Sequence, residues 1–209
     1  MWSNMGRSPT NSKQKLIETA NDLIWKSSYG SVSVDDICTT SGVKKGSFYY
    51  YFPSKAELAV AVMEQSYLEF ESGINDVFTD EISPITRFEN FATFIYDNQK
   101  FAFEKYGQVC GCPFASLGSE MAGNEEMIQQ KADEIFSRQG TIFAASIKEM
   151  IDHGQLSPDT DVDIKASQVL SFILGQLMMA RIQNDLTNLR EELRLGLLRT
   201  LELSHAEVS

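Results

Sequence analysis

Residues 33–58 read SVDDICTTSGVKKGSFYYYFPSKAEL. This stretch predicts a short helix over 34–40 and a second one over 44–51, with a tight turn at Gly42 between them. Ile37 on the first helix can pack against the second, and the apolar residues of a preceding helix can close the core. This order of elements is the geometry of a helix-turn-helix motif.

The second of these helices concentrates groups that bind the phosphates of DNA. Lys44 and Lys45 can neutralise phosphates, while the hydroxyls of Ser47 and of residues 49–51 can bond phosphate oxygens. Gly46 has no side chain, so the backbone can approach the floor of a groove. The plainer alternative for these side chains is a solvated surface.

The rest of the chain is also expected to be helical, because we find no alternating strand pattern bounded by turn residues. Capping residues, prolines and glycines mark the helix ends. The expected helices are 12–28, 34–40, 44–51, 54–79, 84–106, 113–122, 125–153, 159–184 and 186–204. We therefore predict an all-α protein of about nine helices, with a three-helix domain at 1–53 and a second helical domain at 54–209.

The charge distribution assigns any DNA contact to the N-terminal part. The net charge is −11 for the whole chain. Residues 1–57 carry seven Lys or Arg and five Asp or Glu, which leaves 11 basic and 24 acidic residues for 58–209. Phosphates should repel the acidic part.

The sequence also points to a cellular compartment. No window of 18 or more apolar residues predicts a membrane span, and the polar segment Met1–Thr10 lacks the apolar run of a secretion signal. Three cysteines do not form a disulfide framework. We expect a cytoplasmic protein without a membrane partner.

The run from Ser33 to Leu58 resembles the signature of the tetracycline-repressor (TetR) family. The Gly-Val turn, the Lys-Gly-Ser, the Tyr-Tyr-Phe and the Ser-Lys-Ala-Glu-Leu occur in order at fixed spacing. The resemblance covers residues 12–60 in motif and the whole chain in length and helix order. It implies a dimeric transcriptional repressor that binds a palindromic operator in double-stranded DNA through 1–53 and binds a small-molecule effector through 54–209.

The resemblance also implies roles for individual residues. Lys45 and Gly46 match positions that face base edges. The positions that hold phosphates in the family match Ser33, Ser47, Tyr49, Tyr50, Tyr51 and Lys55. Lys44 stands where the family often has a small hydroxyl residue, which weakens the helix cap but adds a cation.

Two C-terminal helices are expected to form the dimer interface. Helix 159–184 is apolar nearly all round, and leucines recur at steps of three or four along 186–204. The interface residues implied by the family are Phe172, Leu189, Leu193, Leu197 and Leu201. The alternative is that both helices close the core of their own domain.

The effector site is expected between the longer helices, where the family has a cavity. An apolar or aromatic effector would suit the side chains there. The candidate lining residues are Phe91, Ile95, Cys112, Phe136, Phe143 and Phe172. Aromatic residues at helical spacing can equally form plain core.

Cys112 carries an alternative function, that of a thiol sensor of electrophiles or oxidants on the same scaffold. It precedes the expected helix 113–122, and a helix N-terminus lowers the pKa of a thiol. Cys110 would be its resolving partner. The opposing interpretation is a buried, inert cysteine. No metal site is expected, because the two cysteines do not have the usual zinc spacing.

We expect no enzymatic activity and no cofactor. The chain has two histidines, His153 and His205, without an evident nucleophile beside them, and it lacks a phosphate loop, a nucleophile elbow or an HExxH motif. A helical enzyme is the minor alternative. A DNA-binding protein without a ligand is a third class, which a solid C-terminal core would favour.

Overall fold

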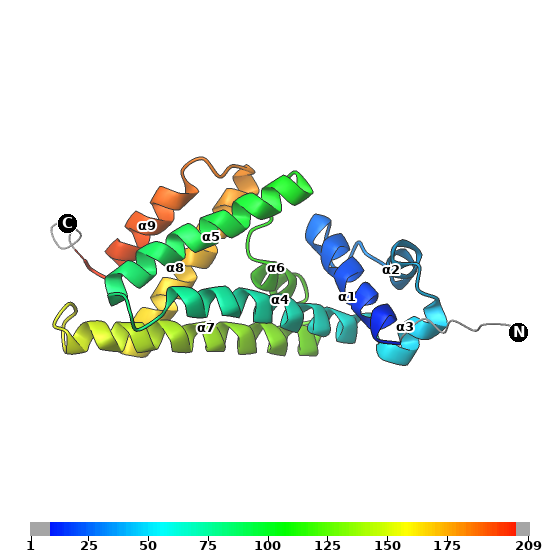
Figure 1. The fold of residues 1–209 in the computed structure, drawn as a ribbon, viewed down its shortest axis with the longest axis horizontal. Helices are drawn as coiled ribbons and strands as arrows, with labels where there is room; N and C mark the ends of the chain where they lie inside the picture. Colours follow the sequence, from blue (N-terminus) through cyan, green and yellow to red (C-terminus); the bar gives the residue numbers. More distant parts are fainter. Residues whose placement is uncertain (1–8, 204–209) are drawn as a thin grey trace, which may run out of the picture. The chain divides into compact units, whose positions relative to one another are not determined.

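A computed structural model describes residues 9–203, and its regular elements in that range are all α-helices (Figure 1). They are α1 (Pro9–Lys26), α2 (Val34–Ser41), α3 (Lys45–Tyr51), α4 (Lys55–Val77), α5 (Pro84–Tyr106), α6 (Pro113–Glu120), α7 (Glu126–Asp152), α8 (Val162–Gln183) and α9 (Leu189–Thr200). The predicted all-α class is therefore confirmed. Most of the polar segment Met1–Thr10, and His205, lie outside the described residues.

Local capping chemistry sets several of the helix starts. The Ser33 hydroxyl accepts the N–H of Asp36 at 3.1 Å, and the Asp36 carboxylate accepts the N–H of Ser33 at 2.9 Å, which completes a capping box at α2. Ser83 caps α5 by accepting the N–H of Thr86, and Pro84 occupies the first turn. Each of these interactions joins residues three positions apart, so the helix starts can be predicted from the sequence.

Two helices, α8 and α9, begin three residues later than the sequence predicts. Asp161 accepts the N–H of Ile164 at 3.0 Å and caps α8, so the helix begins at Val162 rather than at residue 159. Asp185 accepts both the N–H and the hydroxyl of Thr187, which holds a turn ahead of α9. In both places an aspartate side chain accepts a backbone N–H two or three residues further on, and this hydrogen bond sets the later start of the helix.

The contacts between residues divide the chain into two compact units. Unit 1 contains residues up to Tyr67 together with Ser116–Ala132, and unit 2 contains Leu68–Ala115 together with the chain from Asp133 onward. The division differs from the expected boundary at residue 53, because α4, α6 and α7 each pass from one unit to the other. The functional boundary at residue 53 stays a prediction.

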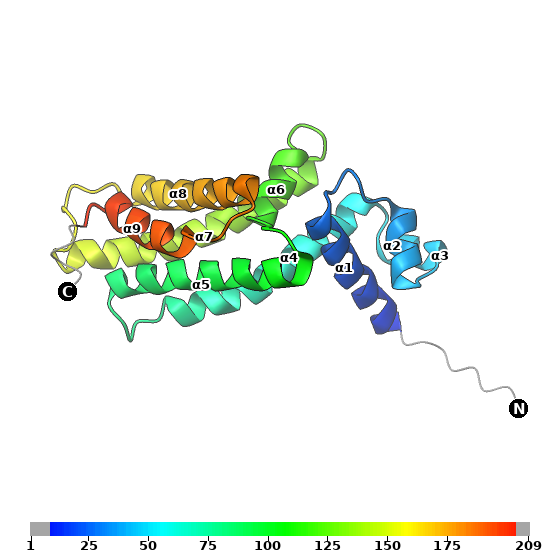
Figure 2. The ribbon, with the colours of Figure 1, turned by 90° about the horizontal axis from the view of Figure 1, so that it is seen from above.

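Unit 1 is built around α1, α2 and α3, which pack against one another (Figure 2). Its apolar core is fully or nearly buried. The core residues include Leu16, Ile17, Ala20, Val32, Ile37, Val43, Phe48, Phe52, Leu58 and Val62. The core thus fixes the orientation of the two short helices of the expected motif.

In unit 2, α9 lies against both α5 and α8 (Figures 1 and 2). Four phenylalanine rings from three segments meet in its interior, with ring centroids 5.3 to 6.1 Å apart. They are Phe78, Phe88, Phe91 and Phe143. No helix among residues 9–203 is long and apolar enough to cross a membrane.

Candidate DNA-binding site

The turn between α2 and α3 has the geometry that the sequence predicts. Gly42 ends α2 in the left-handed conformation, with φ of 66°, and its N–H points to the carbonyls of Cys38 and Thr39. The N–H of Val43 donates to the Cys38 carbonyl at 3.2 Å. The turn thereby places α3 across α2 on the buried side chains of Ile37 and Val43.

Helix α3 presents one buried and one open face. Phe48 is fully buried, whereas Tyr50 is 80% exposed and Tyr49 is 49% exposed. Lys44, Lys45 and Gly46 at its start are also exposed. Ser47 and Tyr51 are half-buried. An open run of cations and phenols is suited to contact phosphates and base edges.

The start of α3 has no side-chain cap. Lys44 occupies the N-cap position, and its side chain accepts no backbone N–H. The free N–H groups of the first turn are therefore left for another acceptor. A phosphate at this position would gain both from those amides and from the ammonium group.

Lys45 is paired with a residue that the sequence analysis did not single out. Its Nζ lies 2.7 Å from Oδ1 of Asp35 in the first turn of α2. The hydrogen bond to Asp35 raises the pKa of Lys45, and the Coulomb attraction of the same carboxylate adds to it. Lys45 is thus a charged, exposed group whose ammonium is paired with a carboxylate of α2.

The ammonium of Lys55 has partners within the chain. It donates to the carbonyl oxygens of Tyr29 and Val32, each at 2.9 Å, and lies 3.9 Å from the centroid of the Tyr29 ring. Burial lowers the pKa of Lys55, and the carboxylates of Glu120 and Glu125 oppose this shift. Two of the three donors of Lys55 are therefore used, and its contact with phosphate stays a prediction.

Of the expected dimer residues, the structure places the four leucines in the interior of unit 2. Leu189, Leu193, Leu197 and Leu201 are each at most 3% exposed, all within the core of their own chain. The half-buried Phe172 covers Gly196, where an added Cβ would clash with the ring. The leucines of α9 thus pack into the core of their own chain, and their part in a dimer interface stays a prediction.

The apolar surface that remains open lies instead along α8. Ile182 is 69% exposed, Ile164 is 58% exposed and Met179 is 50% exposed. Gln168, Ser171 and Gly175 are also exposed on this helix. The sequence predicts that helix 159–184 takes part in the dimer interface and points to Phe172 on it. Because α8 is apolar nearly all round, its pattern does not show which side is covered.

The expected effector residues all lie in unit 2, and they differ in burial. Phe91, Ile95 and Phe143 are at most 3% exposed, and two of them belong to the cluster of four phenylalanine rings. Phe136 and Phe172 are half-buried. These five residues are apolar, so they offer dispersion contacts and aromatic faces rather than charge.

The segment before α6 is held by polar side chains. The Gln99 amide both accepts the N–H of Gly111 at 2.9 Å and donates to its carbonyl at 3.0 Å.

Burial raises the pKa of the Cys112 thiol to about 11, against the opposing effect of the backbone N–H groups of Ala115 and Phe114. Burial also raises the pKa of Cys110. Both cysteines are thus protonated thiols at neutral pH.

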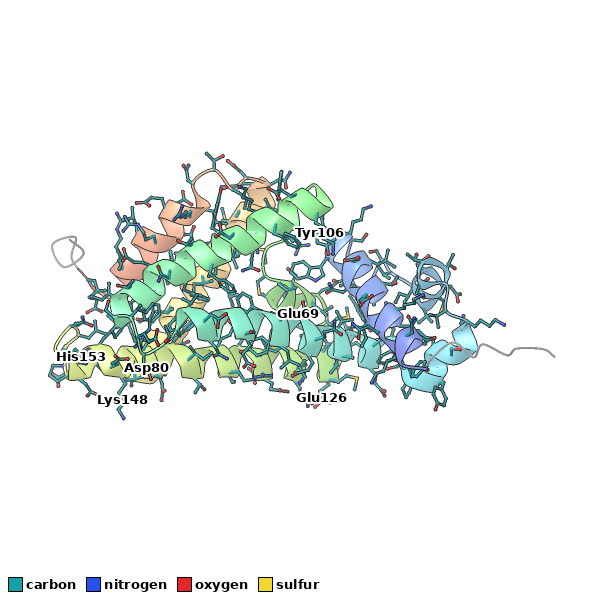
Figure 3. All side chains as sticks on the ribbon, viewed as in Figure 1. Glu69, Asp80, Tyr106, Glu126, Lys148 and His153 are labelled. Carbon is teal, nitrogen blue, oxygen red and sulfur yellow. The ribbon has the colours of Figure 1, made fainter. Side chains whose placement is uncertain are left out.

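His153, one of the two histidines weighed for an enzyme, is exposed just after α7. Figure 3 shows His153 and Lys148 pointing outward near this end of the helix. Among residues 9–203, no group of three or more His, Cys, Asp or Glu side chains has the arrangement of a metal site.

The structure therefore defines a class of protein, the helix-turn-helix DNA-binding regulators. Residues 16–62 match the family described as "Bacterial regulatory proteins, tetR family", and residues 85–195 match "Tetracyclin repressor-like, C-terminal domain". Together these matches cover most of the chain. The chain belongs to the TetR family, and it is a transcriptional repressor of that family.

Individual relatives agree with this assignment. An uncharacterized HTH-type transcriptional regulator from the lacX 3′ region of Lactococcus lactis is 26% identical over 182 residues, which are 84% of this chain and 86% of the relative. The HTH-type transcriptional repressor DhaR of Mycobacterium sp. strain GP1 is 23% identical over 182 residues, 87% of each chain. A TetR-family regulator from Agrobacterium tumefaciens has the same fold, with a TM-score of 0.80 at 22% identity, covering 92% of this chain and 98% of that one.

Proposed function

We propose that the protein binds a palindromic operator as a homodimer and leaves it when a small apolar or aromatic effector binds. The observation that carries this proposal is the open face of α3, where cations and phenols stand beside a buried phenylalanine. Tyr50 is 80% exposed, and its ring meets that of the neighbouring Tyr51 edge-on, so most of the Tyr50 side chain is open to a partner.

The proposed operator contacts follow from this face. Lys45 and Gly46 would read base edges from the first turn of α3. Phosphates would be held by the expected set of Ser33, Lys44, Ser47, Tyr49, Tyr50, Tyr51 and Lys55. The uncapped amides at the start of α3 support a phosphate at this position.

The proposed dimer forms through α8. Its exposed positions recur every three or four residues, as in the seam between two packed helices. The seam consists of Ile164, Gln168, Ser171, Gly175, Met178 and Ile182. Its small residues allow a second helix to approach closely, and a second copy of this chain is the partner that a two-fold operator requires.

The proposed effector site lies in unit 2. The half-buried ring of Phe172 packs against the apolar core that contains Phe91, Ile95 and Phe143. The half-buried Phe136 belongs to the same unit. Cys112, whose thiol is neutral, fits this site as a small apolar neighbour. These side chains support an effector with few polar groups.

The test of this function is a selection of duplexes from a random library by the wild-type protein, followed by binding titrations on the selected sequence. We expect one palindromic motif, and we expect Lys45→Ala and Tyr50→Phe each to weaken binding about tenfold or more while helicity is kept. A library that yields no preferred sequence would remove the proposed function.

A further inference from the structure

One carboxylate in α6 is bound to the loop that leads into α2. Oε1 of Glu120 accepts the N–H of Gly30 at 2.7 Å, and Oε2 accepts the N–H of Tyr29 at 3.1 Å. Each oxygen thus takes one backbone amide, which is a strong, charge-assisted arrangement. Ninety residues separate the partners in sequence, and all three belong to unit 1.

Gly30 makes room for this carboxylate. A Cβ built at residue 30 would lie 3.0 Å from Oε1 of Glu120, closer than ordinary van der Waals contact. The backbone of Gly30 does not have a positive φ, so its conformation does not require glycine. The absence of a side chain at this position therefore serves the approach of Glu120.

The same loop is held from the other side by Lys55. The Glu120 carboxylate accepts hydrogen bonds from the backbone N–H groups of Tyr29 and Gly30. The Lys55 ammonium donates hydrogen bonds to the backbone carbonyls of Tyr29 and Val32. Tyr29 itself is 5% exposed. An anion and a cation thus fix a loop whose next residue, Ser33, caps the first helix of the DNA-binding motif.

We propose that Glu120 is a positioning residue for operator binding, which holds the loop ahead of α2 to α6 and so makes α6 part of the DNA-binding body. This inference rests on the proposed function. Glu120 is the last residue of α6, so its two hydrogen bonds tie the end of this helix to the loop.

The experiment compares three single variants on the duplex that the wild-type protein selects. Glu120→Gln removes the charge and leaves one acceptor for two amides. Gly30→Ala keeps every charge and pushes the carboxylate away from the loop. Glu125→Gln is the matched control, because Glu125 makes the same kind of Coulomb contribution to the pKa of Tyr29 as Glu120 does, but Glu120 makes the two hydrogen bonds to the loop.

Operator affinity and the hydrogen exchange of the Tyr29 and Gly30 amides are both measured. We expect Glu120→Gln and Gly30→Ala each to weaken operator binding about fivefold to tenfold and to speed exchange at both amides. The double variant should be no weaker than the worse single one, because both changes break one clamp. Glu125→Gln should leave both readouts unchanged.

Two results would overturn the inference while the proposed function stands. Unchanged exchange in Glu120→Gln and Gly30→Ala would show that the clamp does not hold the loop. Faster exchange with unchanged operator affinity would show that the loop does not position the DNA-binding helices. A wild-type protein that selects no sequence would instead remove the proposed function itself, so the two failures are distinct.

Discussion

The carboxylate of Asp35 lies 2.7 Å from the ammonium of Lys45, so the leading cation of the DNA-facing helix already has an anionic partner. The two side chains are 69% and 54% exposed, respectively. An ion pair this open contributes little to folding stability. Its effect falls instead on DNA, because Asp35 repels phosphate and draws the ammonium of Lys45 to the first turn of α2.

The first prediction is that the ion pair between Asp35 and Lys45 weakens binding to DNA that lacks the operator sequence. Asp35→Asn should bind a mixed-sequence duplex about threefold to tenfold more tightly at low salt, and its salt dependence should steepen by roughly one unit, because Lys45 becomes free to neutralise one more phosphate. The unfolding free energy should change by less than about 0.5 kcal/mol. Anisotropy titrations at several salt concentrations measure the binding.

The control for this prediction is Asp97→Asn, which removes the same charge from an exposed position on α5 in unit 2. An equal rise in affinity in both variants would mean that net charge, and not the pair with Lys45, is responsible.

The second prediction separates two roles for Lys55. If it serves mainly to hold the loop at Tyr29 and Val32, Lys55→Ala should lower stability by about 1–3 kcal/mol, because two carbonyls lose their donor. The salt dependence of operator binding should then stay close to that of wild type. If Lys55 contacts a phosphate, as the family resemblance implies, Lys55→Ala should instead flatten the salt dependence of operator binding by about one unit.

Lys44→Ala is the matched comparison for Lys55→Ala. Lys44 is exposed and makes no side-chain cap, so its loss should flatten the salt dependence and leave stability unchanged. Urea denaturation and salt titrations on both variants decide the matter. Two variants that behave alike in both measurements would contradict the structural role of Lys55.

Much of the DNA-binding motif could be predicted because its determinants are local. The capping box joins Ser33 to Asp36, and Gly42 turns the chain within the same short stretch. Such interactions depend on residues three or four apart, which a sequence displays directly. The exposed positions of α3 followed from the same run.

What could not be predicted depends on residues that are distant in sequence. Glu120 follows no pattern that would connect it to Gly30. The leucines of α9 show a second limit of sequence patterns. Their spacing identifies an apolar face, but it does not show that Leu193 is buried within its own chain. Ile182 on the apolar helix α8 is exposed instead. Periodicity reports that a face is buried, not which chain buries it.

The third prediction tests the assignment of these two faces. Ile182→Asp should shift the protein from dimer to monomer in light scattering while its helicity is kept, because a carboxylate in the α8 seam would lose its water on association. Operator affinity should fall with the dimer. Phe101→Asp, at a 67% exposed position on α5, is the control that should remain dimeric.

Leu193→Ala should act through folding rather than assembly. Leu193 is fully buried, so its truncation should cost about 2–5 kcal/mol of unfolding free energy, as is typical for a cavity in a core. Dimerisation of the fraction that remains folded should be preserved. A stable monomer from Leu193→Ala would return the interface to α9.

The last prediction concerns the thiol of Cys112. Its pKa of about 11 in the folded protein, raised by burial from an ordinary value of 9.0, means that the fold favours the protonated form. This contribution to stability is complete below pH 9 and is lost as the pH rises through 11, by up to about 2–3 kcal/mol. Cys112→Ala should therefore flatten the loss of stability between pH 9 and 11, as measured by urea denaturation.

The same pKa bears on the thiol-sensor alternative. At pH 7 only about one Cys112 in ten thousand would be a thiolate, so alkylation should be slow and should speed up with rising pH. Oxidant or electrophile should then release operator DNA from wild type and from Cys112→Ser to the same extent. Fast release from wild type at pH 7 that Cys112→Ser abolishes would establish the sensor instead, and would place the trigger next to Gly111 at the start of α6.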